Sequence, residues 1–207
     1  KLILPSPLAP GQKCTITTPF HEKLPFNFSR GGHDGESYQA TQWYPKPAVY
    51  DKNGWHPMPY LDQGEFYSEF GSFDVSITVP KNYVVAATGE LQNEEEKNWL
   101  KTRASFSWTP EKKKIKTKGG GARIVTEQFP PSAKETKTLR FTQNNIHDFA
   151  WFADKRFIVN EDTCRLPSGR EIRVFSYYTP VQKEKWQKSV QFTKDAVLYY
   201  STRVGEY

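Results

Sequence analysis

The sequence has few residues that could cross-link the chain or hold a metal. It contains two cysteines, Cys14 and Cys164, and four histidines among 207 residues. Two isolated cysteines cannot form a zinc knuckle, and a disulfide between them requires their Cα atoms to lie within about 7 Å in the fold. Two unpaired buried thiols are therefore the favoured interpretation, and a disulfide remains open.

Long apolar runs are also missing. No stretch approaches the roughly 20 apolar residues that a membrane-spanning helix needs. The chain does not open with a charged region followed by an apolar one, so we expect no signal peptide at Lys1, although a leader could have been removed upstream. We predict no membrane span, and we favour a secreted or periplasmic location, which the two cysteines do not decide.

Positive charge exceeds negative charge, but it does not form a nucleic-acid motif. The formal net charge is +6, from 29 Lys and Arg against 23 Asp and Glu, and basic residues gather at 111–118 and 183–188. Such isolated runs usually form solvated faces, with an anionic partner as the alternative. We therefore predict no nucleic-acid partner.

Aromatic residues are the abundant class. Only 36% of the residues are hydrophobic, yet 15% are aromatic, so burial must rest on few, large side chains. This composition favours β structure over a helical bundle. Fifteen prolines and 13 glycines are scattered along the chain, which indicates frequent turns between short strands.

Alternation of apolar and polar residues predicts an antiparallel β-sandwich. The clearest strand covers 73–79, where Phe73, Val75, Ile77 and Val79 share one face until Pro80 ends the pattern. Shorter candidates of the same kind cover 83–91, 104–109, 122–128 and 138–143. We predict exposed loops at the charged runs 94–96 and 112–114, and the glycines at 119–121 lack the Lys-Ser/Thr and helix of a phosphate loop.

The pattern changes near residue 170. A strand is predicted at 171–178, followed by a helix over 180–204 that begins with a capping box formed by Thr179, Pro180 and Gln182. The helix carries a mostly apolar stripe: Trp186, Val190, Thr193, Val197, Tyr200 and Val204. A lone strand and helix cannot cover each other's remaining apolar faces, so we predict two domains, 1–165 and a truncated 166–207.

An aromatic and proline-rich segment occupies 37–60. Prolines deny it the full hydrogen bonding of a central strand. Its rings are interpreted first as a plug of the core beneath loops. The alternative function is a binding module in which Trp43, Trp55 and Tyr60 form a stacking platform for a sugar or peptide.

Several segments, in this order and spacing, resemble the amino-terminal region of zinc aminopeptidases of the aminopeptidase N family. The resemblance covers about residues 37–207. The segments that carry it are Thr-Gln-Trp-Tyr-Pro-Lys-Pro-Ala-Val-Tyr-Asp at 41–51, Gly-Glu-Phe-Tyr at 64–67, 71–80, Ala-Thr-Gly-Glu-Leu at 87–91 and Asp-Phe-Ala-Trp-Phe-Ala-Asp at 148–154.

The resemblance implies a β-sandwich resting on a thermolysin-like α/β catalytic domain, of which 166–207 would be the opening strand and helix. Family members remove amino-terminal residues from peptides with a zinc ion held by a His-Glu-x-x-His helix and a later Glu. The nearest string, at 21–25, has Pro25 where the second His must stand. We therefore expect no catalytic residue and no metal ligand in this chain, the zinc of the parent enzyme being held elsewhere. The implied partners are a peptide substrate and the remainder of the catalytic domain.

One residue role carries over from the resemblance. Gln42 matches a family glutamine that reaches from the sandwich towards the amino terminus of the substrate, and the alternative is a structural hydrogen bond. Tyr44 stands where relatives often have Glu or Gln. The negative charge that would attract the ammonium group of a substrate is therefore absent at that position.

Overall fold

The chain is mainly β, and its sheets are antiparallel. The computed structural model describes residues 3–26, 30–59, 61, 63–116 and 122–207, and for 113–116 and 122–127 it covers the backbone alone. Every pair of named strands runs antiparallel. The prediction of a mainly β chain with antiparallel sheets is confirmed.

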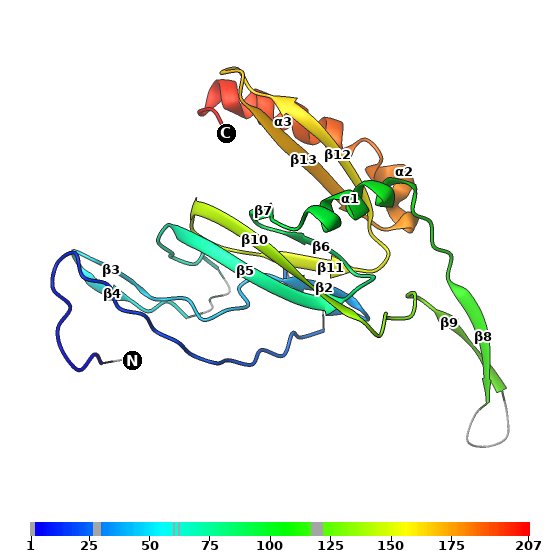
Figure 1. Cartoon of the computed structure of the whole chain (residues 1–207), viewed down its shortest axis with the longest axis horizontal. Helices are drawn as coiled ribbons and strands as arrows, with labels where there is room; N and C mark the ends of the chain where they lie inside the picture. Colours follow the sequence, from blue (N-terminus) through cyan, green and yellow to red (C-terminus); the bar gives the residue numbers. More distant parts are fainter. Residues whose placement is uncertain (1–2, 27–29, 60, 62, 117–121) are drawn as a thin grey trace.

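Two sheets build the main body (Figure 1). The first has the order β1-β2-β11-β6, with bounds Gly32–Asp34, Ser37–Ala40, Trp151–Asp154 and Val84–Ala87. The second has the order β5-β10-β7, with bounds Gly71–Pro80, Thr136–Ile146 and Glu90–Leu91. Side chains from both sheets form one core: Ile77, Val79, Tyr83, Val85, Leu139, Phe141, Phe149 and Ala153.

The predicted alternation of β5 is confirmed. Ile77 and Val79 are buried and Phe73 and Val75 are partly buried, while the residues between them face solvent. The reason is the two-residue period of a strand, which sends every second side chain into the core. Strand β10 pairs with β5 along nearly its whole length.

The other strand predictions fared unevenly. The segment 138–143 lies in β10, and 122–128 corresponds to β9 (Ala122–Glu127), which pairs with β8 (Glu111–Lys116). The predicted strand 83–91 is two short strands, β6 and β7. The strand predicted at 104–109 is wrong, because a 3-10 turn, Arg103–Ser105, leads into a stretch without strand pairing.

Two predicted loops are regular elements. The acidic run 94–96 opens helix α1 (Glu94–Thr102), where negative charge suits the amino-terminal end of the helix dipole. Glu96 is buried and paired with Lys137 at 2.7 Å. The basic run 112–114 lies in β8. The glycine run 119–121 lies outside the described residues.

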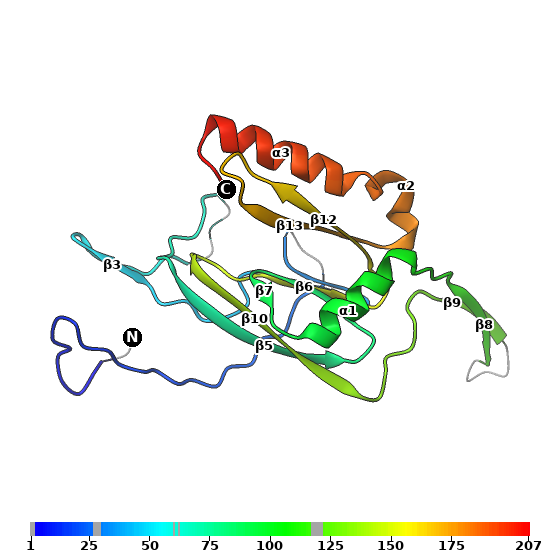
Figure 2. The same cartoon turned by 45° about the horizontal axis from the view of Figure 1, so that its top comes forward.

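The carboxy-terminal part is a hairpin covered by a helix. Strand β12 (Ile158–Arg165) pairs with β13 (Glu171–Tyr178) along its full length, and helix α3 (Ser189–Arg203) lies over one face of the pair (Figure 2). The strand predicted at 171–178 is confirmed, but β12 was not predicted. The expected domain boundary at 165/166 falls in the turn of this hairpin.

The predicted single helix over 180–204 is interrupted. A 3-10 turn, Pro180–Gln182, precedes the short helix α2 (Lys183–Trp186), and α3 begins at Ser189. The Thr179 side chain makes no capping hydrogen bond, so the capping box is wrong. Within the predicted stripe Val190 and Val197 are partly buried.

Several other apolar side chains on and beside these helices face outward. We call them the outer face: Val181, Trp186, Phe192, Tyr199, Tyr200 and Val204, each about half or more exposed.

Strands β3 (Val49–Asp51) and β4 (Gly54–His56) form a separate hairpin. Cys14 is exposed and Cys164 buried, and neither is in a disulfide, so only one of the two thiols is buried as predicted. No helix among the described residues is long and apolar enough to cross a membrane.

Candidate functional site

Gln42 lies in a compact polar cluster centred on Asp148. The loop after β2 brings Gln42, Tyr44 and Lys46 to this carboxylate, which immediately precedes the segment entering β11. Gln42 Nε2 donates to Asp148 Oδ2 at 2.5 Å, Tyr44 donates its hydroxyl to Oδ1 at 3.2 Å, and Lys46 Nζ lies 2.9 Å from Oδ1. The backbone N–H of Phe149 also donates to Oδ1, at 2.7 Å.

The loop that carries Gln42 is held in an uncommon conformation. Gln42 has a φ of 53°, the left-handed region that side chains other than glycine and asparagine rarely adopt. The next residue anchors the loop, since Trp43 Nε1 donates to the carbonyl of Phe149 at 3.0 Å. Non-glycine residues in this region cost energy and cluster at functional sites, so the conformation motivates a functional hypothesis.

The charge of Asp148 fixes which end of the Gln42 amide is engaged. An ionised carboxylate only accepts hydrogen bonds, so the amide nitrogen must face it. The carbonyl oxygen Oε1 is then the end of the Gln42 amide that remains for another donor. Burial, together with the adjacent charge of Asp148, raises the pKa of Tyr44 above its usual range, so its phenol stays neutral and keeps donating.

Negative charge is therefore present beside Gln42, although Tyr44 does not supply it. Asp148 provides the carboxylate from a segment 104 residues further along the chain. Lys46 balances much of this charge, and its Nζ lies 5.5 Å from the centre of the Tyr44 ring. Sequence reasoning missed Asp148 because its segment, 148–154, carried the family resemblance without any assigned role.

Of the three rings of the predicted platform, the two that the structure describes lie in different surroundings. Trp43 packs against the main core and meets Trp151 edge-on at 6.4 Å. Trp55 is 65% exposed and pairs with the equally exposed Tyr50 on the β3–β4 hairpin. Tyr60 lies outside the described residues, so its part in a platform stays a prediction.

The described side chains hold no group of three or more His, Cys, Asp and Glu arranged for a metal ion. His56 is engaged by Asp51, with Nε2 to Oδ1 at 2.8 Å. The string at 21–25 belongs to an extended amino-terminal segment.

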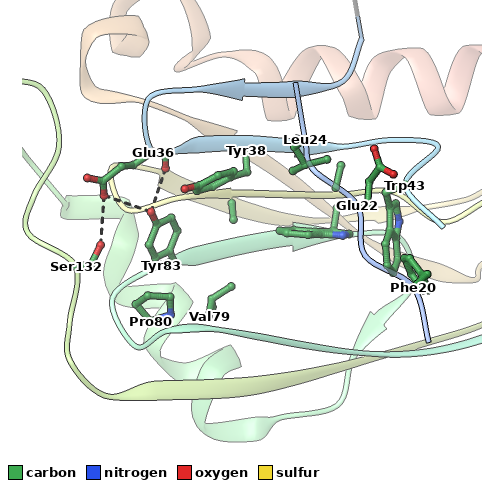
Figure 3. Close-up of a pocket in the computed structure, with 13 residues that line it drawn as sticks. Phe20, Glu22, Leu24, Glu36, Tyr38, Trp43, Val79, Pro80, Tyr83 and Ser132 are labelled. Carbon is green, nitrogen blue, oxygen red and sulfur yellow. Dashed lines mark hydrogen bonds between the residues drawn. The ribbon is translucent and has the colours of Figure 1, made fainter. Parts of the chain in front are cut away.

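A second feature is a cleft of about 730 Å³ (Figure 3). Residues of β2 and β11 from the first sheet, of β5 from the second sheet and of the amino-terminal segment line it. Aromatic side chains form much of its wall, and Glu36, Ser132 and Tyr83 form a polar end. Its lining residues are Phe20, Glu22, Leu24, Glu36, Tyr38, Ala40, Trp43, Val79, Pro80, Tyr83, Ser132, Trp151 and Ala153.

Comparison of the chain with family models, with curated proteins and with solved structures found no match.

Proposed function

We propose that this chain is the amino-terminal, non-catalytic region of a zinc aminopeptidase. Residues 1–165 would form a β-sandwich that frames the substrate cleft, and 166–207 would open a thermolysin-like catalytic domain. The zinc ion and its ligands would belong to the rest of that domain, and the substrate would be a peptide. The sequence resemblance over 37–207 is the basis of this proposal.

The outer face of α2 and α3 is the observation that supports it best. Phe192 and Tyr200 are 62% and 60% exposed, and Val204 is 83% exposed. A two-stranded sheet covered by one helix buries little apolar surface, and an apolar helix face usually packs against another layer. The remainder of a catalytic domain would supply that layer.

The Gln42 cluster supports the role of the first domain. Asp148 orients the Gln42 amide so that its carbonyl oxygen is the end available to accept from a substrate ammonium group. The left-handed backbone at Gln42 would hold the loop in one conformation in the absence of substrate, so that the site is preorganised. Lys46 keeps Asp148 largely neutralised, so most of the ammonium charge would be met by groups beyond this chain.

The experiment compares the chain alone with the same chain extended by its downstream sequence. We expect the extended protein to contain about one zinc ion and to hydrolyse amino-acid amides, because a catalytic zinc requires three protein ligands. We expect the 207-residue chain to do neither. Stoichiometric zinc in the short chain, or a downstream sequence without His-Glu-x-x-His over roughly the next hundred residues, would contradict the proposal.

A binding module remains the second candidate, supported by the exposed pair on the β3–β4 hairpin. The Tyr50 and Trp55 rings lie 5.0 Å apart and are each 65% exposed. Paired exposed aromatic rings can stack on a sugar or a peptide ring. Under this alternative Trp55→Ala would abolish ligand binding by the chain alone while Gln42→Ala would leave it intact.

A further inference from the structure

The cleft lined by β2, β11 and β5 exists because small residues occupy core-facing positions on β2 and β11. In the register of β2 and β11, Ala40 lies opposite Trp151 and Tyr38 lies opposite Ala153. An alanine therefore stands beside an aromatic ring twice on the same face, and the two short side chains leave space that the rings enclose. Gln42 and Asp148 are not among the lining residues, so this cleft is separate from the proposed substrate site.

The polar end of the cleft is built around Glu36. Lys155 Nζ donates to Glu36 Oε2 and to the Ser132 hydroxyl at 3.0 Å, and the Lys155 side chain is only 1% exposed. Ser132 also donates to Oε2, at 3.3 Å, whereas the Tyr83 hydroxyl has its nearer acceptor in the backbone carbonyl of Glu36 at 3.2 Å, with Oε2 at 3.4 Å. Lys155 and Ser132 therefore use the same oxygen, no described residue donates to Oε1, and the Glu36 side chain is 47% exposed.

A second carboxylate stands near the opposite end. Glu22 belongs to the extended segment that also brings Phe20 and Leu24 to the cleft, next to Trp43 (Figure 3). Glu22 has no ion pair among the residues that the structure describes. Because Lys155 compensates only Glu36, the lining of the cleft and its buried lysine together carry an excess of negative charge.

These features define the chemistry of a ligand. The volume lies within the range of about 300–1,000 Å³ that is typical of small-molecule sites, and such sites combine apolar walls with a few polar groups. Glu36 Oε1, on a half-exposed side chain, can accept from an N–H group of a ligand, and aromatic walls attract a cation through their ring faces. We propose that the cleft binds a primary amine with an aromatic body, the ammonium group at Glu36 Oε1 and the ring between Tyr38 and Trp151.

The test uses the 207-residue chain and three probes that each carry one phenyl ring. Calorimetry is run with 2-phenylethylamine, 2-phenylethanol and 3-phenylpropanoate, which differ in charge at one end. We expect the amine to bind at least about tenfold more tightly than the alcohol, the factor for one charge-assisted hydrogen bond, and the carboxylate to be rejected. Equal binding of amine and alcohol, or no amine binding at millimolar concentration, overturns the proposal.

Variants assign the binding to the cleft. Glu36→Gln removes the acceptor charge and should weaken amine binding about tenfold without affecting the alcohol. Since that change also leaves Lys155 buried without its carboxylate and could unfold the chain, Glu22→Gln on the exposed segment is the second variant, with an expected loss of about twofold to fivefold. Glu171→Gln on β13 is the matched control.

Filling the space gives an independent check. Ala153→Leu extends into the cleft and should abolish binding of both amine and alcohol, while the circular dichroism spectrum stays that of a folded β protein. Amine binding that survives Ala153→Leu and Glu22→Gln would place the ligand elsewhere and overturn the proposal. The dipeptide Phe-Gly carries the same ring and ammonium group, and tighter binding of the dipeptide than of 2-phenylethylamine would identify a peptide amino terminus as the source of the amine.

Discussion

At the scale of single residues, Gln42 is the side chain whose role is best defined by its surroundings. Its amide nitrogen is held by Asp148 at 2.5 Å, and its backbone is left-handed. If the parent is the aminopeptidase proposed above, Gln42→Ala in that enzyme should lower kcat/KM by roughly tenfold to a hundredfold, the range for one hydrogen bond to a charged group. Because the charge of Asp148 is largely balanced by Lys46, we expect the loss to lie near the lower figure.

Gln42→Gly is the matched variant for this measurement. Glycine removes the same amide but tolerates a φ of 53°, whereas alanine at that φ is strained. The alanine variant should therefore melt at a lower temperature than the glycine variant, while both lose the same catalytic efficiency. Full efficiency in the glycine variant would show that the Gln42 amide serves structure alone.

The pH dependence of folding should report Glu36. The hydrogen bond from Lys155, and secondarily its charge, lower the pKa of Glu36 below its ordinary value of 4.5. A carboxyl group whose pKa is lower in the folded state stabilises the fold above its unfolded pKa, and this stabilisation is lost as the pH falls through the folded pKa. We therefore expect the wild-type chain to lose stability below about pH 4.5.

The measurement is the midpoint of urea unfolding at pH 7 and at pH 3. Glu36→Gln should lower the midpoint at pH 7 and reduce the difference between the two pH values, since glutamine does not titrate. Glu171→Gln should leave both midpoints close to wild type. An unchanged pH difference in Glu36→Gln would mean that the bond to Lys155 does not contribute to folding stability.

At the scale of elements, β5 contributes Ile77 and Val79 to the buried core. Ile77 is 7% exposed and faces the opposite sheet, while Val75 is only partly buried. Ile77→Ala should cost about 2–4 kcal/mol of unfolding free energy, and Val75→Ala about 1 kcal/mol, because the cost follows the buried volume removed. Ser76→Ala, on the exposed face, should change it by less than about 0.5 kcal/mol. Similar values for Ile77 and Ser76 in urea titrations would mean that the inward face is wrong.

Elements with a strict period could be predicted from sequence, and those without one could not. Strand β5 alternates along most of its length, so its inward face was predicted, whereas β13 was predicted as a strand without a face because its buried Ser176 stands between two aromatic residues. Strand β12 was missed because its buried residues, Ile158, Val159 and Cys164, flank a polar middle that faces solvent. Helix α1 was missed because its three glutamates suggest solvent exposure. One of them, Glu96, is nevertheless buried and forms an ion pair with Lys137.

The candidate site was predictable only in part. The resemblance pointed to Gln42, but its partner lies 106 positions away and is brought to it by the pairing of β2 with β11. Local pattern cannot reveal such a contact, because register between distant strands depends on the whole sheet. The cleft likewise depends on Ala40 and Ala153, which look unremarkable in sequence and matter only by their register with Trp151 and Tyr38.

At the scale of the whole molecule, the outer face of α2 and α3 tests whether 166–207 packs against further protein. Phe192 is 62% exposed, so Phe192→Ser removes little buried surface from the isolated chain. We expect its melting temperature to change by no more than that of Gln191→Ser, the neighbouring exposed position. We also expect less self-association in analytical ultracentrifugation, because an exposed aromatic patch promotes it.

In the complete parent protein the same substitution should behave differently. If the remainder of the catalytic domain covers the outer face, Phe192 becomes buried, and its replacement by serine should cost about 1.5–3 kcal/mol, the range for burying such a side chain. Gln191→Ser removes no apolar side chain and loses only the exposed hydrogen bond from Gln191 Nε2 to Asp195, so it measures the cost of changing a neighbouring helix position. Equal, small effects of both substitutions in the parent would mean that the outer face stays open, and the packing of 166–207 into a larger catalytic domain through this face would have to be abandoned.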